Sequence, residues 1–376
     1  MEYKQDCRWF SGYKPCKFKR SCVDCPNYSK PQSRIAIVSL EAMGAVLRST
    51  CLLPPIKSHF PDSHITWITM PACKPLLAGN PYIDRIIPLS ASTLTLVELM
   101  EFTHLFAVDK SAEAGALATK VKADDKRGFG VDKNGIIVPL NQEAEYQYQL
   151  GLDDELKFFI NQKPETQQIT ESMGLPWERA EYILELNKEE QAQVKKQRHG
   201  WLSELGLPDS TPIIGYNTGC SKLFPYKKFT VSKAIDLVTE WRRNFPESPI
   251  SLFGGPEDTD RQAEIKEHFV NDPFVINTPT TNGLRNGVLS MATSNLVFSG
   301  CSLGMHIAIG LKIPTIAWFG VSCIQEIDLY DRGIKIQSEV SCSPCWKKSC
   351  SMDVKCFNSV PLEKIISATS QLLKEP

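Results

Sequence analysis

The sequence predicts an α/β protein made of two doubly wound domains. Two series of short apolar runs, one beginning at Arg34 and one at Pro212, alternate with segments whose apolar residues recur at helical spacing. Such alternation is typical of parallel sheets covered by helices. The chain has 376 residues, which is enough for two domains of ordinary size. We therefore expect one sheet in each half of the chain.

The first series gives four expected strands, of which residues 34–40 (RIAIVSL) form the clearest buried run. The other three strands are expected at residues 64–70, 85–89 and 104–108. Helical patterns are expected at residues 94–101 and 113–121. A further helix should begin near Val46 and be kinked or ended by Pro54 and Pro55, because proline lacks a backbone N–H.

The second series follows an irregular, mostly helical span that contains the domain junction, with a long charged helix expected at residues 188–205. Three strands are expected at residues 212–216, 250–253 and 274–277, and helices at residues 231–244 and 361–373. The predicted parts of the chain are a cysteine-rich segment at 1–33, a first domain at 34–175, a second domain at 176–340, and a cysteine-rich segment with a closing helix at 341–376.

Composition excludes several classes of protein. The net charge of −1 argues against a broad nucleic-acid-binding surface, because such surfaces are strongly basic. The first ten residues lack the apolar core of a signal peptide, and no apolar run approaches the 18 residues of a membrane-spanning helix. We expect a cytoplasmic protein with at most peripheral membrane contact.

Eight of the thirteen cysteines fall into two terminal clusters, Cys7, Cys16, Cys22 and Cys25, and Cys342, Cys345, Cys350 and Cys356. Each cluster contains a C-x2-C pair, the spacing that lets two thiolates bind one ion. In a reducing compartment, four close thiols more often hold a metal than form disulfides. We therefore expect structural zinc or iron at these cysteines, with disulfides as the alternative.

Residues 296–320 (LVFSGCSLGMHIAIGLKIPTIAWFG) form the most informative stretch. An apolar strand is followed by a turn, by a helix that Ser302 can cap, and by a second strand after Pro314. In a parallel sheet this arrangement places a helix N-terminus at the carboxyl edge of the strands, where backbone N–H groups favour a pyrophosphate. The alternative is an ordinary structural unit, because most such units in α/β proteins bind nothing.

The same stretch resembles the signature of glycosyltransferase family 9, the heptosyltransferase family. The shared positions are Gly300, Ser302, His306, Ala308, Pro314, Phe319 and Gly320, whereas Cys301 stands where the family usually has Asp. The resemblance covers about residues 34–374. It implies the GT-B architecture, in which a cleft lies between two Rossmann-like domains.

The resemblance also implies a binding site for the diphosphate of the donor. Phe224-Pro225-Tyr226-Lys227 is similar to the family's Trp-Pro-x-Lys loop, in which the lysine contacts the diphosphate. A solvated lysine cluster is the alternative. The candidate donor-binding residues are Thr218, Gly219, Lys227, Glu257 for the ribose, Ser302, Leu303, Gly304 and His306, of which His306 has core packing as its alternative role.

The general base departs from the family pattern. The turn after the first strand carries Gly44-Ala45 where the family has Gly-Asp, and alanine cannot accept a proton. Asp109 is the first substitute, because it follows an expected strand at the carboxyl edge of the sheet and is similar to an acidic position of relatives that modify proteins. Its alternative role is a cap for the helix that begins near Ser111, and Glu41 is the second candidate.

The Asp258-Thr259-Asp260 sequence could be mistaken for a D-x-D metal site. It lies at the start of an expected helix, where acidic residues suit the helix dipole, so we interpret it as structural and expect no catalytic divalent ion.

The resemblance implies an inverting, metal-independent glycosyltransferase. The donor would be a nucleotide-diphosphate sugar such as ADP-heptose, and the acceptor a lipopolysaccharide-type glycan or a protein hydroxyl. A metal at the C-terminal cysteines would either fix how the two domains meet or offer a surface for homo-oligomer formation. One alternative is an inactive sugar-nucleotide-binding or assembly protein that carries Ala45 and Cys301 in place of acids. Another is a cysteine-rich redox or metal protein, which would leave the two predicted domains without a role.

Overall fold

The computed structural model describes residues 3–352 and 355–374, so the outermost residues of both cysteine-rich end segments lie outside the described part. Contacts divide the chain into two compact units, each with its own six-stranded sheet. The first unit comprises Met1–Asp153 and Thr166–Ala180, and the second comprises Asp154–Glu165 and Glu181–Pro376. The predicted domain boundary at residue 175 lies near this division, but the short segment 154–165 belongs to the second unit.

The first sheet has the strand order β3-β2-β1-β4-β5-β6. Its strands are parallel except for β6, which runs antiparallel to β5. The strands are β1 (Ser33–Val38), β2 (Ser63–Thr69), β3 (Arg85–Pro88), β4 (Glu101–Ala107), β5 (Lys122–Val131) and β6 (Ile137–Pro139). Strand β1 lies between β2 and β4, as its continuous apolar run requires.

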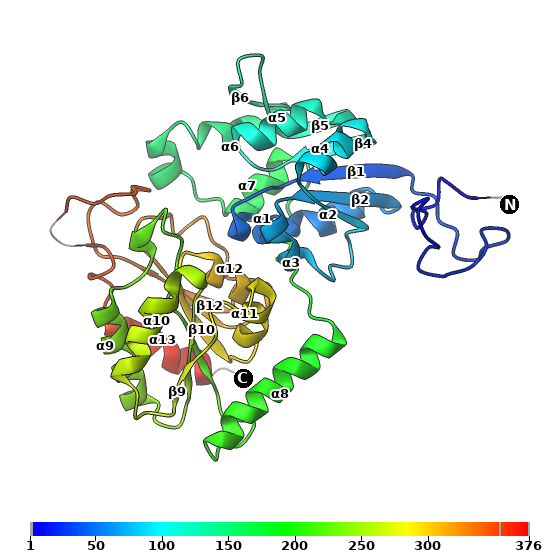
Figure 1. Ribbon diagram of the computed structural model, residues 1–376. Coiled ribbons are helices and arrows are strands. Elements are labelled where there is room, and N and C mark those ends of the chain that lie inside the picture. Colours follow the sequence, from blue (N-terminus) through cyan, green and yellow to red (C-terminus); the bar gives the residue numbers. More distant parts are fainter. Residues whose placement is uncertain (1–2, 353–354, 375–376) are drawn as a thin grey trace. The chain divides into compact units, whose positions relative to one another are not determined.

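Short helices surround this sheet in the first unit (Figure 1). They are α1 (Met43–Arg48), α2 (Leu53–His59), α3 (Lys74–Leu77), α4 (Ala91–Leu99), α5 (Ala112–Lys120), α6 (Glu145–Gln149) and α7 (Glu165–Ser172). The helix that we expected Pro54 and Pro55 to kink or end already stops at Arg48, before the prolines. A 3-10 turn, η1 (Ser49–Leu52), follows α1, and the prolines occupy the first turn of α2, where the missing N–H would have had no helical partner.

The second sheet has the order β12-β11-β10-β7-β8-β9, and its strands are all parallel. The strands are β7 (Ile214–Asn217), β8 (Ile250–Phe253), β9 (Val275–Asn277), β10 (Leu296–Gly300), β11 (Thr315–Phe319) and β12 (Gly333–Gln337). Read from its other edge, this order is the order of the first sheet. Each unit is therefore doubly wound, as predicted.

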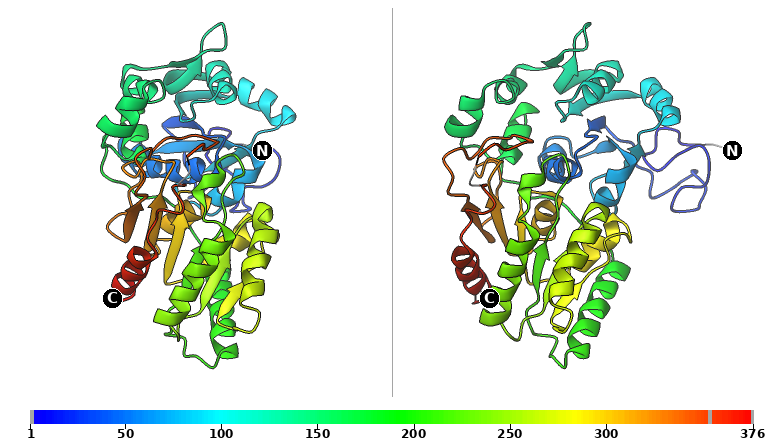
Figure 2. Two further views of the ribbon diagram at one scale, coloured as in Figure 1. Left: turned by 90° about the vertical axis from the view of Figure 1, so that its left-hand side faces the viewer. Right: turned by 60° about the vertical axis from the view of Figure 1, so that its left-hand side comes forward.

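The helices of the second unit include a pair, α9 and α13, that lies side by side (Figures 1 and 2). The helices are α8 (Lys188–Glu204), α9 (Val231–Asn244), α10 (Thr259–His268), α11 (Leu284–Met291), α12 (Leu303–Gly310) and α13 (Leu362–Lys374). The buried indole N–H of Trp241 on α9 donates to Thr369 Oγ1 on α13 at 3.0 Å. The closing helix thus packs on the core of the second unit.

The two cysteine-rich ends are irregular. In the described residues 3–32, and in 338–352 with 355–361, the chain forms turns rather than helices or strands, and the described cysteines are all free thiols. No described helix combines the length and the apolar character needed to cross a membrane.

Candidate functional site

The start of α12 lies at the C-terminal end of β10, next to the end of β7. Ser302 is the N-cap residue, but its hydroxyl does not bond to the helix. It accepts a hydrogen bond from Asn217 Nδ2 at 2.9 Å instead. Gly304 packs against the same amide, and a Cβ at this position would overlap it. The first-turn N–H groups of α12 therefore have no side-chain cap from Ser302, as a helix start that binds an anion requires.

Lys227 comes to the same edge of the second sheet. Its carbonyl oxygen packs so closely on Gly300 that a Cβ there would overlap it. The Lys227 ammonium also lowers the pKa of Cys301, opposing the larger effect of burial, which raises it. Thus the structure brings the predicted lysine and the predicted helix start together.

The Lys227 ammonium has no ion-pair partner among the described residues, and it lies over two aromatic rings. Its neighbour Lys228 differs, because its Nζ lies 2.8 Å from the buried carboxylate of Asp258. Asp258 also accepts a bond from the Gly255 amide at 3.2 Å. Of these adjacent lysines, Lys227 has the charge that is available to an anionic ligand, and Asp258 has the structural role expected of it.

The other predicted donor-binding residues near β7 make mainly structural contacts. The buried hydroxyl of Thr218 donates to the Phe253 carbonyl at 3.0 Å. A Cβ on Gly219 would overlap the carboxylate of Asp258. Glu257 is exposed and accepts a bond from the Lys222 amide at 3.2 Å. Leu303, the first residue of α12, is partly buried.

His306 lies in the core, with 6% of its surface exposed. Its Nδ1 lies 3.3 Å from the hydroxyl of Tyr182, and the two rings stack with centroids 5.8 Å apart. These contacts are those expected if His306 packs in the core, which was the alternative to binding a phosphate.

The two candidate bases lie close together in the first unit, Glu41 on the turn after β1 and Asp109 after the end of β4. Asp109 Oδ1 accepts from the Ser39 hydroxyl at 3.2 Å, and its Oδ2 accepts from the amides of Leu40 and Glu41. The Glu41 side chain is exposed. Asp109 does not cap α5, because Ser111 does so by accepting a bond from the Ala114 amide at 3.2 Å.

Burial raises the pKa of Asp109 to about 6, although the bonds from Leu40, Glu41 and Ser39 oppose this rise. A carboxyl group with such a pKa is mostly ionised at pH 7 and can still accept a proton efficiently. Ala45 lies within α1, where its methyl group offers no acid or base.

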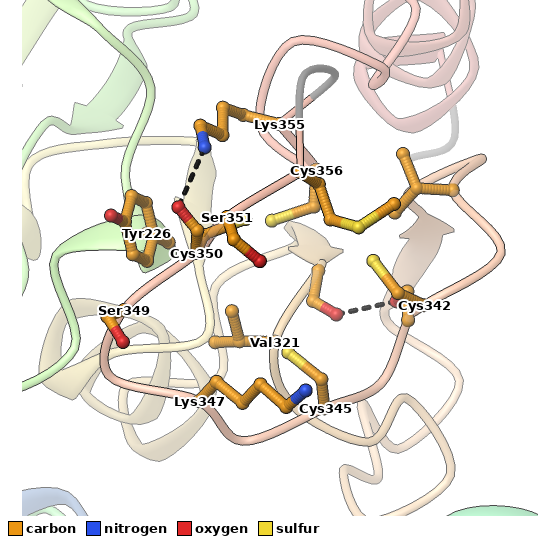
Figure 3. Close-up of a pocket in the computed structure, with 14 residues that line it drawn as sticks. Tyr226, Val321, Cys342, Cys345, Lys347, Ser349, Cys350, Ser351, Lys355 and Cys356 are labelled. Carbon is orange, nitrogen blue, oxygen red and sulfur yellow. Dashed lines mark hydrogen bonds between the residues drawn. The ribbon is translucent and has the colours of Figure 1, made fainter.

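The C-terminal cysteines line a cavity of about 80 Å³ (Figure 3). Cys342, Cys345, Cys350 and Cys356 contribute to its wall, together with Tyr226. Burial, aided by the other three thiols of the cluster, raises the pKa of Cys356 to about 11. The four side chains are therefore near neighbours.

No described group of three or more His, Cys, Asp or Glu side chains is arranged to hold a metal ion. The donor set in the cavity fits a thiophilic ion, but its present spacing does not form a ligand shell. The N-terminal cysteines, from Cys7 to Cys25, lie in successive turns, and they are not assembled into such a group either.

Sequence reasoning missed three side chains near this edge of the second sheet: Asn217, Lys157 and Trp346. Asn217 ends β7, so its position after an apolar strand was a usable signal. Lys157 and Trp346 approach Lys227 only through long-range packing, which no local pattern encodes.

Solved structures have the same two-domain arrangement of strands and helices. The chain is similar to a family 9 glycosyltransferase from Veillonella parvula, with a TM-score of 0.69 and 20% identity over 92% of this chain and 98% of that one. It is also similar to ADP-heptose lipopolysaccharide heptosyltransferase II of E. coli, with a TM-score of 0.67 and 15% identity over 90% and 98%. The chain has the GT-B fold.

The GT-B fold also relates the chain to TibC of enterotoxigenic E. coli, which is described as an iron-containing, dodecameric glycosyltransferase. That similarity has a TM-score of 0.52 at 10% identity and covers 92% of this chain and 77% of TibC. No family model and no curated protein matches the sequence. The likeness to family 9 structures therefore lies in the fold.

Proposed function

We propose that the chain is an inverting glycosyltransferase that uses a nucleotide-diphosphate sugar and needs no catalytic metal. The supporting observation is that the Lys227 carbonyl packs on Gly300, just before the uncapped start of α12, and that the Lys227 ammonium acts on the neighbouring Cys301. Sugar transfer leaves a nucleoside diphosphate, whose negative charge must be stabilised as the glycosidic bond breaks. A lysine and a helix N-terminus together provide that stabilisation without an ion.

A heptose is the proposed sugar. Structures with this fold are described as ADP-heptose heptosyltransferases, and TibC is described in complex with ADP-D-β-D-heptose. The proposed acceptor is a lipopolysaccharide-type glycan or a protein hydroxyl, met in the cytoplasm or at a membrane surface. Self-association is part of the proposal, because TibC is described as dodecameric.

The proposed base is Asp109, and Glu41, on the neighbouring turn after β1, is the second candidate. The pKa of about 6 suits Asp109 for accepting the acceptor's proton near neutral pH. Its bonds to the Ser39–Glu41 turn also fix its orientation.

The donor site is tested by calorimetry with ADP. Replacing Lys227 by Ala removes one charge-assisted contact, so we expect a loss of ~1.5–3 kcal/mol, or about tenfold to a hundredfold in affinity. Lys222→Ala is the matched control, because Lys222 is an exposed lysine of the same loop. Equal ADP affinity in the parent and in Lys227→Ala would mean that the donor site lies elsewhere.

An inactive sugar-nucleotide-binding protein is the second candidate function. Ala45 and Cys301 favour it, since both stand where the resembling family has acids. Product formation from ADP-heptose separates the two candidates. Introducing a carboxylate by Ala45→Asp is the companion test, because a rise in rate would mark a disabled site.

A structural metal at the C-terminal cysteines is a separate proposal. Four thiols lining one cavity are a donor set that suits zinc or iron, and TibC is described as iron-containing. We propose that the ion would draw Cys342, Cys345, Cys350 and Cys356 together, and we assign it no step in sugar transfer.

A further inference from the structure

Trp346 connects the C-terminal cysteine segment to the loop of Lys227. It follows Cys345 directly, and the backbone amides of both residues donate to the Val321 carbonyl, at 2.8 and 3.1 Å. Its φ of +48° lies in the left-handed region, which is unfavourable for a residue with a side chain. Surrounding contacts must therefore hold the indole where it is.

The indole ring holds the end of the Lys227 side chain. Lys227 Nζ lies 4.1 Å from the centroid of the Trp346 ring and 5.0 Å from that of Phe224. The two rings meet edge to face, with centroids 5.5 Å apart and planes at 85°. Because a lysine side chain is long and flexible, a cation–π contact of this kind limits the positions of the ammonium.

A second lysine approaches the same ring. Lys157 Nζ lies 4.8 Å from the Trp346 centroid and 3.7 Å from a carboxylate oxygen of Glu326. The carbonyl groups of Lys157 and Phe158 each accept a bond from Gln325 Nε2 at 3.2 Å, which fixes this part of the chain. Trp346 thus contacts two ammonium groups, of which that of Lys157 is paired with Glu326, so Lys227 is the one whose charge is left for an anionic ligand.

We propose that Trp346 is a positioning residue that holds Lys227 for the diphosphate of the nucleotide donor. The inference rests on the proposed donor site. The C-terminal cysteine-rich segment would then act on the donor site through Trp346, and its cysteines would not need to contact the donor. The chemistry recognised is that of a nucleoside diphosphate, and the probe is ADP.

The test is a double-mutant cycle of ADP affinity measured by calorimetry. Trp346→Leu should weaken ADP binding about 3- to 10-fold, the usual range of a cation–π contact, whereas Trp346→Phe, which keeps an aromatic ring, should retain most of the affinity. In a Lys227→Ala background, Trp346→Leu should cause no further loss. Tyr226→Leu is the matched control, because Tyr226 is a nearby aromatic residue that lines the cysteine cavity and stacks on Phe357 instead of on Lys227.

The affinities of these variants test the proposed donor site and the proposed role of Trp346 separately. If Lys227→Ala has no effect, the donor site itself is misplaced. If Lys227→Ala weakens binding but Trp346→Leu does not, or if the two losses add fully, Trp346 does not act through Lys227.

Fluorescence provides a second measurement if Trp346→Leu fails to fold. ADP should change the tryptophan emission of the parent, because the ammonium beside the indole is drawn to the phosphates. The change should be lost in Trp346→Phe and in Lys227→Ala. An unchanged response in Trp346→Phe would overturn the inference.

Discussion

Asp109, the proposed base, also holds together the turn that follows β1. Its oxygens accept three bonds from the turn that follows β1, and burial still raises its pKa to about 6. The sequence correctly placed Asp109 at the end of a strand. It did not show that the side chain bonds to Ser39, Leu40 and Glu41, because those residues are distant in sequence.

We expect Asp109→Asn to lower turnover by ~10²–10⁴-fold while leaving ADP affinity nearly unchanged, because Asn keeps the shape but cannot take a proton. In the parent, kcat/KM should fall as the pH drops through about 6, where Asp109 becomes protonated. This decrease in kcat/KM at low pH should be absent in Asp109→Asn. Glu41→Gln is the control, and an unaltered pH profile in Asp109→Asn would assign the base to another group.

The same pKa predicts how stability depends on pH. Because the folded-state pKa of Asp109 is raised, the folded chain binds the proton more tightly than the unfolded chain between about pH 4 and pH 6. The contribution of this proton to stability is therefore present at low pH and is lost as the pH rises through about 6. Asp109→Asn should lack this decline, which we expect to be roughly 1–3 kcal/mol. Denaturant unfolding of both chains across this range measures it, and parallel curves would contradict the assignment.

At the scale of elements, two glycines near the end of β10 allow neighbouring groups to approach the backbone closely. Gly300 admits the carbonyl of Lys227, and Gly304 admits the amide of Asn217. Both glycines precede or open α12, so the start of this helix can lie close to the loop after β7.

Gly300→Ala should destabilise the chain by about 1–3 kcal/mol and weaken ADP binding, because the added methyl group would overlap the Lys227 carbonyl and displace the loop. Gly255→Ala is the matched control, since a Cβ there meets no atom within 4 Å and its φ of −95° suits alanine. Thermal melting and ADP calorimetry of both variants make the comparison. Equal behaviour of the two would show that close packing at Gly300 is not required.

The strands differ in how well they could be predicted from the sequence. Strand β8 was predicted to the residue and β11 was correctly expected after Pro314, because each is a buried apolar run bounded by turn signals. Strand β5 was missed, since its sequence KADDKRGFGV is charged along its first half. Those charges are accommodated by local pairing, as between Arg127 and Asp125 at 2.8 Å, which the apolar pattern cannot reveal. Strand β12 was missed as well, because it is only partly buried.

At the scale of the whole molecule, the doubly wound sheets were predictable and the cysteine-rich ends were not. The spacing of apolar residues identifies strands that are buried in a core. A segment that is ordered by a bound ligand has no such regular spacing. For the proposed donor site, the start of α12 followed from a local pattern and Lys227 from the family resemblance of its loop. Trp346 and Lys157 did not, because tertiary packing alone brings them near.

Metal analysis tests the terminal clusters. Protein purified without added metal should contain one to two tightly held zinc or iron ions per chain. Cys345→Ser should lower the metal content by removing a ligand of the C-terminal cluster, and Cys25→Ser should lower it by removing a ligand of the N-terminal cluster. Cys51→Ser is the control, because Cys51 is buried within η1 of the first unit and belongs to neither cluster. A metal-free parent whose eight clustered thiols all titrate freely would contradict this prediction.

Residues 154–165 have a practical consequence for dividing the protein. In sequence they lie between two stretches of the first unit, yet they bond to the second, as when the Glu165 amide donates to the Glu326 carbonyl at 2.8 Å. A fragment that starts at Glu181 would lose these partners and the lysine that contacts Trp346. Exchange of catalytic halves between proteins of this fold therefore needs more than one junction, and the transplanted piece must include residues 154–165 with 181–376.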